Sequence, residues 1–380
     1  MKVGTLSIYN LDNYGTLLQG YALQETVEQM GHSCHLISYN ITHSPFTLLR
    51  FFIYSLTQNG LSLTLKGVKK YLTHQKALPS LPVLTPSHDI FEDFRDNYLH
   101  LTEITYNPKT LMSHPPGYDA YIVGSDNIWV IGDEIGISDG GARFYLDFVS
   151  QGKKRISYAA SMGNPEIPHH FQKRLVELLQ NIDFISVRER TTTEVLSQLT
   201  QRDVAAVCDP TLLLASYQWD KLISPSSLSQ DEGPYILVYV IHPYAEDAPP
   251  FQFARRLSAD SSYRIKYIGY NYVNSNPIFN TVPVPEFLES FKNAAYVITN
   301  TFHGTMFSLI FRKNFYVFKP KAGPIRISDV LETVALSNRM VETIEEAISL
   351  PMDIDYSESE GKIERFRSES LLWLRNALDE

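Results

Sequence analysis

Short runs of β-branched and aromatic residues alternate along the chain with amphipathic segments of helix length. This alternation is typical of a mostly parallel sheet whose strands are joined by crossover helices, so we expect an α/β fold. In the first half the expected strands are Lys2 to Ser7, Cys34 to Tyr39, Ala120 to Val123, Arg155 to Ala159, Phe184 to Val187 and Ala205 to Cys208. Helices are expected between these strands, notably from Gly15 to Met30, where apolar residues largely share one face.

Residues 215–234 interrupt this pattern. They are rich in serine and polar residues, which is typical of a linker. A second set follows, with expected strands Tyr235 to Ile241, Arg264 to Ile268, Tyr296 to Thr299 and Phe315 to Phe318, and expected helices near Pro250 to Leu257, Pro285 to Lys292 and Gly304 to Phe311. The sequence thus predicts an N-terminal domain over 1–214 and a C-terminal domain over 235–355. Within 356–380, a helix from about Gly361 to Leu378 is expected to cross back over the domain boundary.

Composition narrows the class of protein. The chain has 380 residues, of which 44% are hydrophobic and 20% charged, as in ordinary folded proteins. Its 33 basic and 42 acidic side chains give a formal net charge of −9. Such a chain is a poor candidate for nucleic-acid binding, which depends on basic residues that neutralise phosphates. Any anionic ligand therefore needs a local cluster of positive charge.

The expected location is the cytoplasm. Cys34 and Cys208 are too few for a disulfide framework and fit a reducing compartment, and the first ten residues show no secretion signal. The apolar segment Phe46 to Leu56 is too short to span a bilayer, which takes about twenty residues. Lysines at 66, 69, 70 and 76 follow it, so it is either a packed surface helix or an amphipathic helix on an anionic membrane.

Several familiar motifs are missing from the sequence. It has no dinucleotide-binding glycine fingerprint, no Walker loop, no zinc-protease motif and no serine-hydrolase elbow. His32, Cys34 and His35 suggest zinc, but alternation along a strand points Cys34 away from His35, and a structural zinc site needs four ligands. His169 and His170 are adjacent on an expected helix and do not converge on one ion. We therefore expect no metal.

Candidate chemistry follows the strands, since ligands of parallel α/β sheets bind beyond the carboxyl ends of the strands. Asp126 lies in a Gly-Ser-Asp-Asn turn after one strand, where it is either a helix cap or a site residue. Arg188 and Glu189 end another strand, and Arg188 either grips an anion or pairs with an internal carboxylate. The segment from Arg155 to Gly163 is a strand that ends in small residues, which would let a ligand approach the backbone, but it says little alone.

The sharpest feature is the turn from Thr299 to Thr305, between a strand and an apolar helix. Here His303 is expected at a helix N-terminus, with the backbone N–H groups of Gly304 and Thr305, where partial positive charge favours an anion. His303 and this helix N-terminus are predicted to form, together with Arg188, a small positively charged binding site in an otherwise negative molecule.

An ordered series of motifs carries a resemblance to a known family. The series is Asn13-Tyr14-Gly15 through Tyr21-Ala22-Leu23-Gln24, Gly124 to Trp129, Phe144 to Phe148, Ile156 to Ser161, Ser186 to Glu189, Asp209 to Leu213 and Thr301 to Thr305. In this order it resembles the polysaccharide pyruvyl transferase family. The resemblance implies two Rossmann-like domains that face across a cleft, as in GT-B glycosyltransferases. It also implies transfer of pyruvate from phosphoenolpyruvate to a sugar as a cyclic ketal.

The resemblance also implies residue roles. We assign His303 as the phosphate-binding general acid, Asp126 as the base or acceptor-positioning group and Arg188 as the clamp for the donor's carboxylate or phosphate. The expected substrate-binding residues are Asn13, Tyr14, Ser125, Asn127, Ser161, Asn300, Thr301, Phe302, Gly304 and Thr305. Phosphoenolpyruvate is a co-substrate, and no other cofactor is expected. Asn127, Asn300 and Thr301 depart from the family's usual Gln, Asp and Ser.

The expected partners are phosphoenolpyruvate and a sugar or a lipid-linked or polymeric glycan, with peripheral contact at the inner face of the plasma membrane. Two alternatives stay open. One is a GT-B glycosyltransferase that uses a nucleotide sugar, because a fold does not fix a function. The other is a non-catalytic glycan-binding protein, in which the three departures mark lost chemistry.

Overall fold

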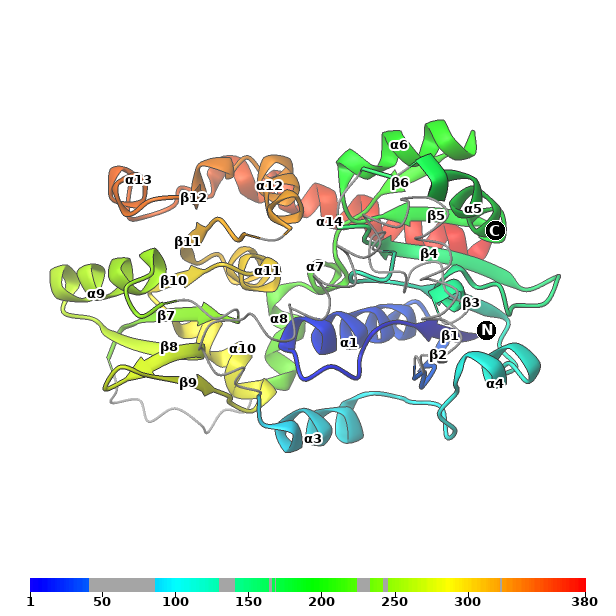
Figure 1. The fold of residues 1–380 in the computed structure, drawn as a ribbon, viewed down its shortest axis with the longest axis horizontal. Helices are drawn as coiled ribbons and strands as arrows, with labels where there is room; N and C mark the ends of the chain where they lie inside the picture. The colour runs from blue at the N-terminus through cyan, green and yellow to red at the C-terminus, as the bar shows by residue number, and fades with distance from the viewer. Residues whose placement is uncertain are drawn as a thin grey trace, which may run out of the picture.

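A computed structural model describes residues 1–40, 86–129, 141–163, 166–167, 169–223, 233–241, 245–321 and 323–380. Within these residues the strands form two six-stranded sheets, one in each half of the molecule (Figure 1). The first sheet has the order β2-β1-β3-β4-β5-β6 and is wholly parallel. The second has the order β12-β11-β10-β7-β8-β9 and is parallel except for the β8–β9 pair. The predicted α/β fold with two Rossmann-like halves is confirmed.

The bounds of the elements follow chain order. The first sheet contains β1 (Lys2–Leu6), β2 (Ser33–Leu36), β3 (Ala120–Val123), β4 (Lys154–Ala160), β5 (Phe184–Val187) and β6 (Val204–Ala206). Its helices are α1 (Tyr14–Gln29), α3 (His88–Tyr98), α4 (Pro108–Ser113), α5 (His169–Leu179), α6 (Arg190–Thr200), α7 (Pro210–Leu213) and α8 (Ser216–Trp219). The second sheet contains β7 (Tyr235–Val240), β8 (Arg264–Val273), β9 (Asn276–Asn280), β10 (Tyr296–Thr299), β11 (Asn314–Phe318) and β12 (Met340–Val341). Its helices are α9 (Pro249–Ser261), α10 (Val284–Asn293), α11 (Phe302–Ile310), α12 (Pro324–Thr333), α13 (Ile344–Ser349) and α14 (Ser357–Asp379).

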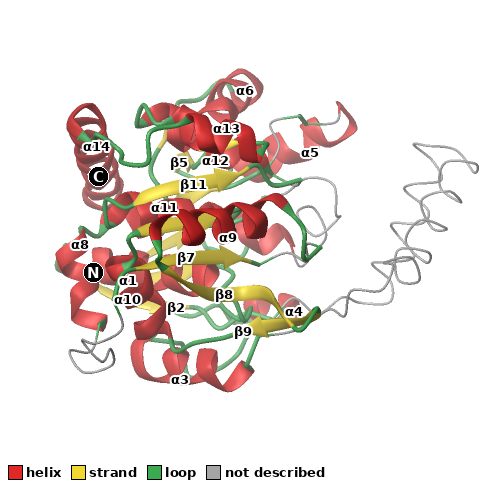
Figure 2. Ribbon diagram, turned by 90° about the vertical axis from the view of Figure 1, so that its left-hand side faces the viewer, coloured by secondary structure: helices red, strands yellow, loops and turns green. Residues whose placement is uncertain are grey.

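The second sheet differs from the expectation at one edge. Figure 2 shows β11, β7, β8 and β9 in the order of the sheet. The sequence analysis missed β9, because Asn276–Asn280 contains a proline and two asparagines and lacks a β-branched run. Asn274 and Ser275, both at positive φ, turn the chain back after β8. Pairing with β9 extends β8 to Val273, beyond the expected end at Ile268.

The helix α14 lies against both halves of the molecule, as its red ribbon in Figure 1 shows. Near its start, the Tyr356 hydroxyl donates to the carbonyl of Lys313, which precedes β11, at 2.7 Å. Farther along, the backbone N–H of Cys208 donates to Ser370 Oγ at 2.9 Å and Arg367 Nε donates to the carbonyl of Leu212 at 2.7 Å. The last helix therefore ties the chain after β6 to the second half. The exact domain boundaries stay predictions.

Apolar packing also joins the two halves through the start of α1. The ring of Tyr14 is 2% exposed and stacks on Phe287 of α10, with 4.1 Å between centroids and 4° between planes. Its hydroxyl donates to the carbonyl of Val282 at 2.6 Å and accepts from the N–H of Val282 at 2.8 Å. Tyr14 was expected to bind substrate. Because its hydroxyl is fully engaged and its ring is buried, it instead fixes α1 to the second half.

The described helices give one further result about membranes. None of them is both long and apolar enough to cross a bilayer. The segment Phe46 to Leu56 and the lysines that follow it lie outside the described residues, so both interpretations of that segment remain open.

Replacing Tyr14 with Phe tests this contact between the halves. Two backbone groups of Val282 would lose their partner while the ring stack stays, so we expect the free energy of unfolding to fall by about 1–2 kcal/mol. Denaturant unfolding measures this loss. Tyr217→Phe on α8 is the control, because its side chain is 70% exposed, and it is expected to change stability by less than about 0.5 kcal/mol. Equal losses in both variants would contradict the assignment.

Candidate functional site

Residues from both sheets converge on the carboxylate of Asp209, which follows β6. Its Oδ1 caps α7 and accepts from the N–H of Thr211 at 3.0 Å and from the Thr211 hydroxyl at 2.7 Å. Its Oδ2 accepts from Arg188 NH1 at 2.9 Å and lies 3.8 Å from His303 Nε2. The carboxylate is fully buried. Arg188 from the first sheet and His303 from the second are thus brought together, as predicted, but around an acid.

His303 is held in the first turn of α11. A Cβ added to Gly15 of α1 would overlap its Nδ1, so the imidazole packs directly on the backbone of the other half. Its Nε2 is buried and makes no hydrogen bond. Burial lowers the pKa of His303, and Arg188 and Arg326 add to this shift, while Asp209 and Asp126 oppose it. The free protein therefore favours a neutral imidazole at neutral pH.

Arg188 follows β5 and is surrounded by acids and an aromatic ring. Besides Asp209, it faces Glu189, with 3.5 Å between Nε and Oε1, and its guanidinium carbon lies 4.3 Å from the centroid of the Phe302 ring. Burial disfavours the charge, but Asp209, Glu189 and Asp126 outweigh it and raise the pKa of Arg188. The guanidinium remains charged. Its Nε and NH2 are buried and form no hydrogen bond.

The charge of this site differs from the prediction. Three carboxylates interact with the cluster, from Asp126, Glu189 and Asp209, whereas Arg188 and Arg326 supply two guanidinium groups. The predicted predominance of positive charge is therefore wrong, because Arg188 already pairs with internal acids. Arg188 and His303 share one acidic neighbour, and NH2 of Arg188 and Nε2 of His303 are buried without a hydrogen-bond partner.

Asp126 lies in the turn after β3, where its backbone has a left-handed φ of 72°. Its Oδ2 accepts from the hydroxyl of Thr16 on α1 at 3.0 Å, and its Oδ1 accepts from the N–H of Asn127 at 2.9 Å. A Cβ at Gly124, whose φ is 132°, would overlap the carbonyl oxygen of Tyr158. Glycine is therefore required for the turn that directs Asp126 toward α1 and the Arg188 cluster.

The turn before α11 is built differently from the expectation. The Thr301 hydroxyl accepts from the N–H of Gly304 at 2.8 Å, and the Thr301 carbonyl accepts from the N–H of Thr305 at 3.1 Å. These two N–H groups were expected to bind an anion, and they are already occupied by the helix cap. Asn300, in contrast, is 2% exposed and neither its Nδ2 nor its Oδ1 has a hydrogen-bond partner.

The other residues expected to bind substrate divide into two groups. Asn13 caps α1 through Oδ1 and therefore has a structural role. Ser125 is fully buried, donates to the carbonyl of Ala159 at 2.8 Å, and lies beside the charged cluster, with its Oγ 3.5 Å from Asp209 Oδ2. Ser161 and Asn127 lie beside the charged cluster, since Ser161 Oγ bonds to Glu189 and lies 3.2 Å from Asn127 Oδ1.

Two residues of this site had no assigned role in the sequence analysis. Asp209 lies in a quoted motif, and its signal was an Asp-Pro helix start directly after a strand. Arg326 lies near the start of α12 and donates from NH1 to Asn127 Oδ1 at 2.9 Å. Arg326 follows no strand directly, so only the tertiary structure reveals its position.

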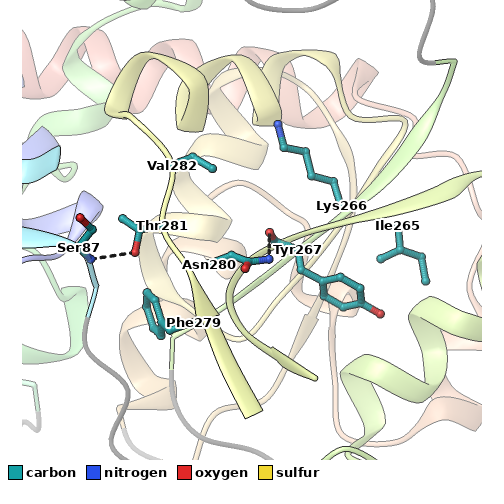
Figure 3. A pocket seen from close by; sticks show the side chains of 8 residues that line it. All are labelled: Ser87, Ile265, Lys266, Tyr267, Phe279, Asn280, Thr281 and Val282. Carbon is teal, nitrogen blue, oxygen red and sulfur yellow. Dashed lines mark hydrogen bonds between the residues drawn. The ribbon is translucent and has the colours of Figure 1, made fainter. Parts of the chain in front are cut away.

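The cavities and the possible metal ligands of the described residues were compared with the predicted site residues. Within the described part of the chain, no group of three or more His, Cys, Asp or Glu side chains is arranged for a metal. An open cavity of about 800 Å³ lies between β8, β9 and the residue before α3 (Figure 3), and none of the predicted site residues lines it. The cavity beside Arg188, Asp209, Phe302 and Arg326 measures only about 10 Å³. This cavity has room for about one water molecule at most.

Known structures share this fold at low sequence identity. A protein of Listeria monocytogenes assigned as a UDP-N-acetylglucosamine 2-epimerase is 9% identical, with a TM-score of 0.52, and the match covers 97% of this chain and 90% of that one. The UDP-GlcNAc 2-epimerase of Methanocaldococcus jannaschii, in complex with UDP-GlcNAc and UDP, is 12% identical, with a TM-score of 0.50 and coverage of 98% and 100%. These similarities show a GT-B-like fold alone.

The sequence comparisons are more specific. No curated protein sequence gives a significant match to the chain. The sequence model described as polysaccharide pyruvyl transferase matches residues 13–321, which include the ends of β3, β5, β6 and β10 where the charged cluster is built. The chain therefore belongs to the polysaccharide pyruvyl transferase family.

Proposed function

We propose that this protein transfers pyruvate from phosphoenolpyruvate to a sugar of a cell-surface glycan or its precursor, forming a cyclic ketal. The observation that carries this proposal is the convergence of Arg188, His303 and Asp126 from the two halves, with buried N–H donors left unpaired. Buried polar groups nearly always have hydrogen-bond partners. Buried groups without such a partner, in the part of the chain that the family model matches, therefore indicate a ligand.

The donor's charges match the unpaired groups. Phosphoenolpyruvate carries a carboxylate and a phosphate, and hydrogen bonds between ionised partners are about twice as strong as neutral ones. Arg188 offers NH2, His303 offers Nε2 when it is protonated, and Asn300 offers its amide. In this arrangement Arg188 is the clamp, and His303 faces the part of the donor that must gain a proton.

The chemistry needs one acid and one base. Protonated His303 gives its proton to the methylene carbon of the donor, which makes the adjacent carbon electrophilic. A sugar hydroxyl adds there and loses its proton to Asp126. The bond to phosphate then breaks, and the second hydroxyl closes the ketal and gives up its own proton. Asp126 passes the first hydroxyl proton to the departing phosphate, and the second hydroxyl proton restores His303, so both residues return to their starting states and the protons balance.

Access to Arg188 requires movement. The cavity beside Arg188 measures about 10 Å³, so the donor does not fit there while the side chains that line it keep these positions. These side chains come from both halves, so a small shift of one half against the other enlarges the cavity. Closure over the bound donor would then exclude water from the electrophilic intermediate.

Incubation with phosphoenolpyruvate and a panel of glycans and glycan precursors tests the proposed function. We expect phosphate release together with a ketal product that is detected by mass spectrometry. His303→Gln is the matched negative control. Absence of product with every acceptor, combined with saturable binding of a nucleotide sugar and none of phosphoenolpyruvate, would reject this function in favour of glycosyl transfer.

His303→Gln is expected to lower kcat by about 10²- to 10⁴-fold, the usual contribution of a general acid. The pH profile gives a second measure. The acid must be protonated, and burial lowers the pKa of His303 below its usual 6.5, so kcat/KM of the wild type should fall as pH rises through that lowered value. The variant should lose this limb of the profile. An unchanged limb would exclude His303 as the group that titrates.

Gly15→Ala tests whether the position of His303 matters, without changing a charged group. A methyl group at this position would overlap the imidazole, so we expect kcat to fall at least about tenfold, because small misplacements of reacting groups are costly. Gly20→Ala on the same helix is the control, since its methyl group would lie 3.3 Å from Leu36 Cδ2 and far smaller adjustments suffice. Equal activity of the two variants would show that the close contact at His303 has no catalytic role.

A further inference from the structure

We propose that Arg326 is a second anchoring residue for the anionic donor and completes, from the opposite half, the site begun by Arg188. This inference rests on the proposed function, because it concerns the same donor. Arg326 lies outside the family match, which covers residues 13–321.

The start of α12 directs Arg326 toward the cluster. Gly323 precedes the helix with a left-handed φ of 65°, and Pro324 forms its first residue. A Cβ on Gly323 would lie 2.7 Å from NH2 of Arg326, so the side chain folds back closely over this glycine. Arg326 then lines the same narrow cavity as Arg188, Asp209 and Phe302.

Among the described residues, the guanidinium of Arg326 has a neutral hydrogen-bond partner and no carboxylate at ion-pair distance. Its NH1 donates to the neutral amide oxygen of Asn127 in the first half, at 2.9 Å. Its Nε is buried and has no hydrogen-bond partner. Among the described residues, no carboxylate oxygen lies within ion-pair distance of its guanidinium, although such partners surround Arg188. Arg326 is thus a buried cation tethered by a neutral group.

The charged form of Arg326 is disfavoured by its surroundings. Burial and the like charge of Arg188 both disfavour the charged form of Arg326, and Asp126, Glu189 and Asp209 offset this only in part. Repulsion between two cations in a medium of low dielectric is relieved when an anion lies between them. Each arginine also retains a donor without a hydrogen-bond partner, Nε of Arg326 and NH2 of Arg188.

The arrangement has a consequence for specificity. Arg188 follows β5 in the first half, and Arg326 belongs to α12 in the second, so one ligand held by both joins the two halves. A donor with two anionic groups, a carboxylate and a phosphate, engages both guanidinium groups at once, whereas pyruvate offers a single anionic group. Arg326 therefore favours binding of phosphoenolpyruvate over binding of pyruvate. Its contribution is to the affinity for the donor and not to proton transfer.

Calorimetry with phosphoenolpyruvate and with inorganic phosphate tests this role on the full-length chain. Arg326→Gln should weaken phosphoenolpyruvate binding by about 10- to 100-fold, which corresponds to the loss of one charged hydrogen-bonded contact. Arg326→Lys, which keeps the charge and loses the planar fork, should lose less. The control is Arg256→Gln on α9, an arginine whose side chain is 58% exposed, and its affinity should equal that of the wild type.

Kinetics separates anchoring from a merely structural role. Anchoring predicts that Arg326→Gln raises the KM for the donor while kcat and the thermal midpoint stay close to those of Arg256→Gln. Wild-type affinity for phosphoenolpyruvate in Arg326→Gln would overturn the inference and leave the proposed function intact. If the wild type binds inorganic phosphate through Arg326 but does not bind phosphoenolpyruvate, the proposed donor is wrong and the anion site stands. If the wild type binds neither, the inference is overturned.

Discussion

The bond between Asp209 and Arg188 is the interaction on which the rest of the site depends. Burial of a carboxylate alone would raise its pKa, but His303, Arg188 and Thr211 outweigh burial and hold the pKa of Asp209 below its usual value. The group therefore stays ionised inside the protein. A buried ion pair of this kind contributes little net stability, and removal of one partner is costly. Its main effect is positional, because it fixes Arg188 beside His303.

This constraint explains why the site combines closely packed acids with unpaired donors. Each carboxylate near Arg188 lowers the positive potential that an anion would meet. Under the proposed function, binding of phosphoenolpyruvate therefore depends on directed N–H groups, which bind an anion strongly only in the correct position. An internal acid that holds the arginine in place restricts its rotamers beforehand, and this would reduce the entropic cost of binding. Such a site would bind the donor selectively but attract it less strongly from a distance.

The sequence predicted the frame of the site more successfully than its contacts. Alternating patterns located most of the strands, and the strand-end rule selected Arg188, Asp126 and His303, which do converge. The rule does not say which acids contact these three residues. Asp209 and Glu189 both follow strands, so the sequence alone does not show which of them binds Arg188 most closely. Tyr14 was misassigned, since an aromatic residue in a family motif looks the same whether it stacks on a sugar or on Phe287. Arg326 was missed, because a helix in the other half brings it to the site.

Asn300 is an amide at a position next to the proposed site, and this bears on which residue donates the proton in the proposed reaction. At the place where the family often has an aspartate, this chain has an amide, which can bind a ligand but has no proton to transfer at ordinary pH. Leaving both ends of a buried amide without partners costs about 1–3 kcal/mol for each group. Such a cost is understandable if a ligand supplies the missing hydrogen bonds, and it is difficult to explain for a purely structural residue. Under the proposed function, acid catalysis then falls to His303, and an anionic donor beside the imidazole would oppose the lowering of its pKa by burial.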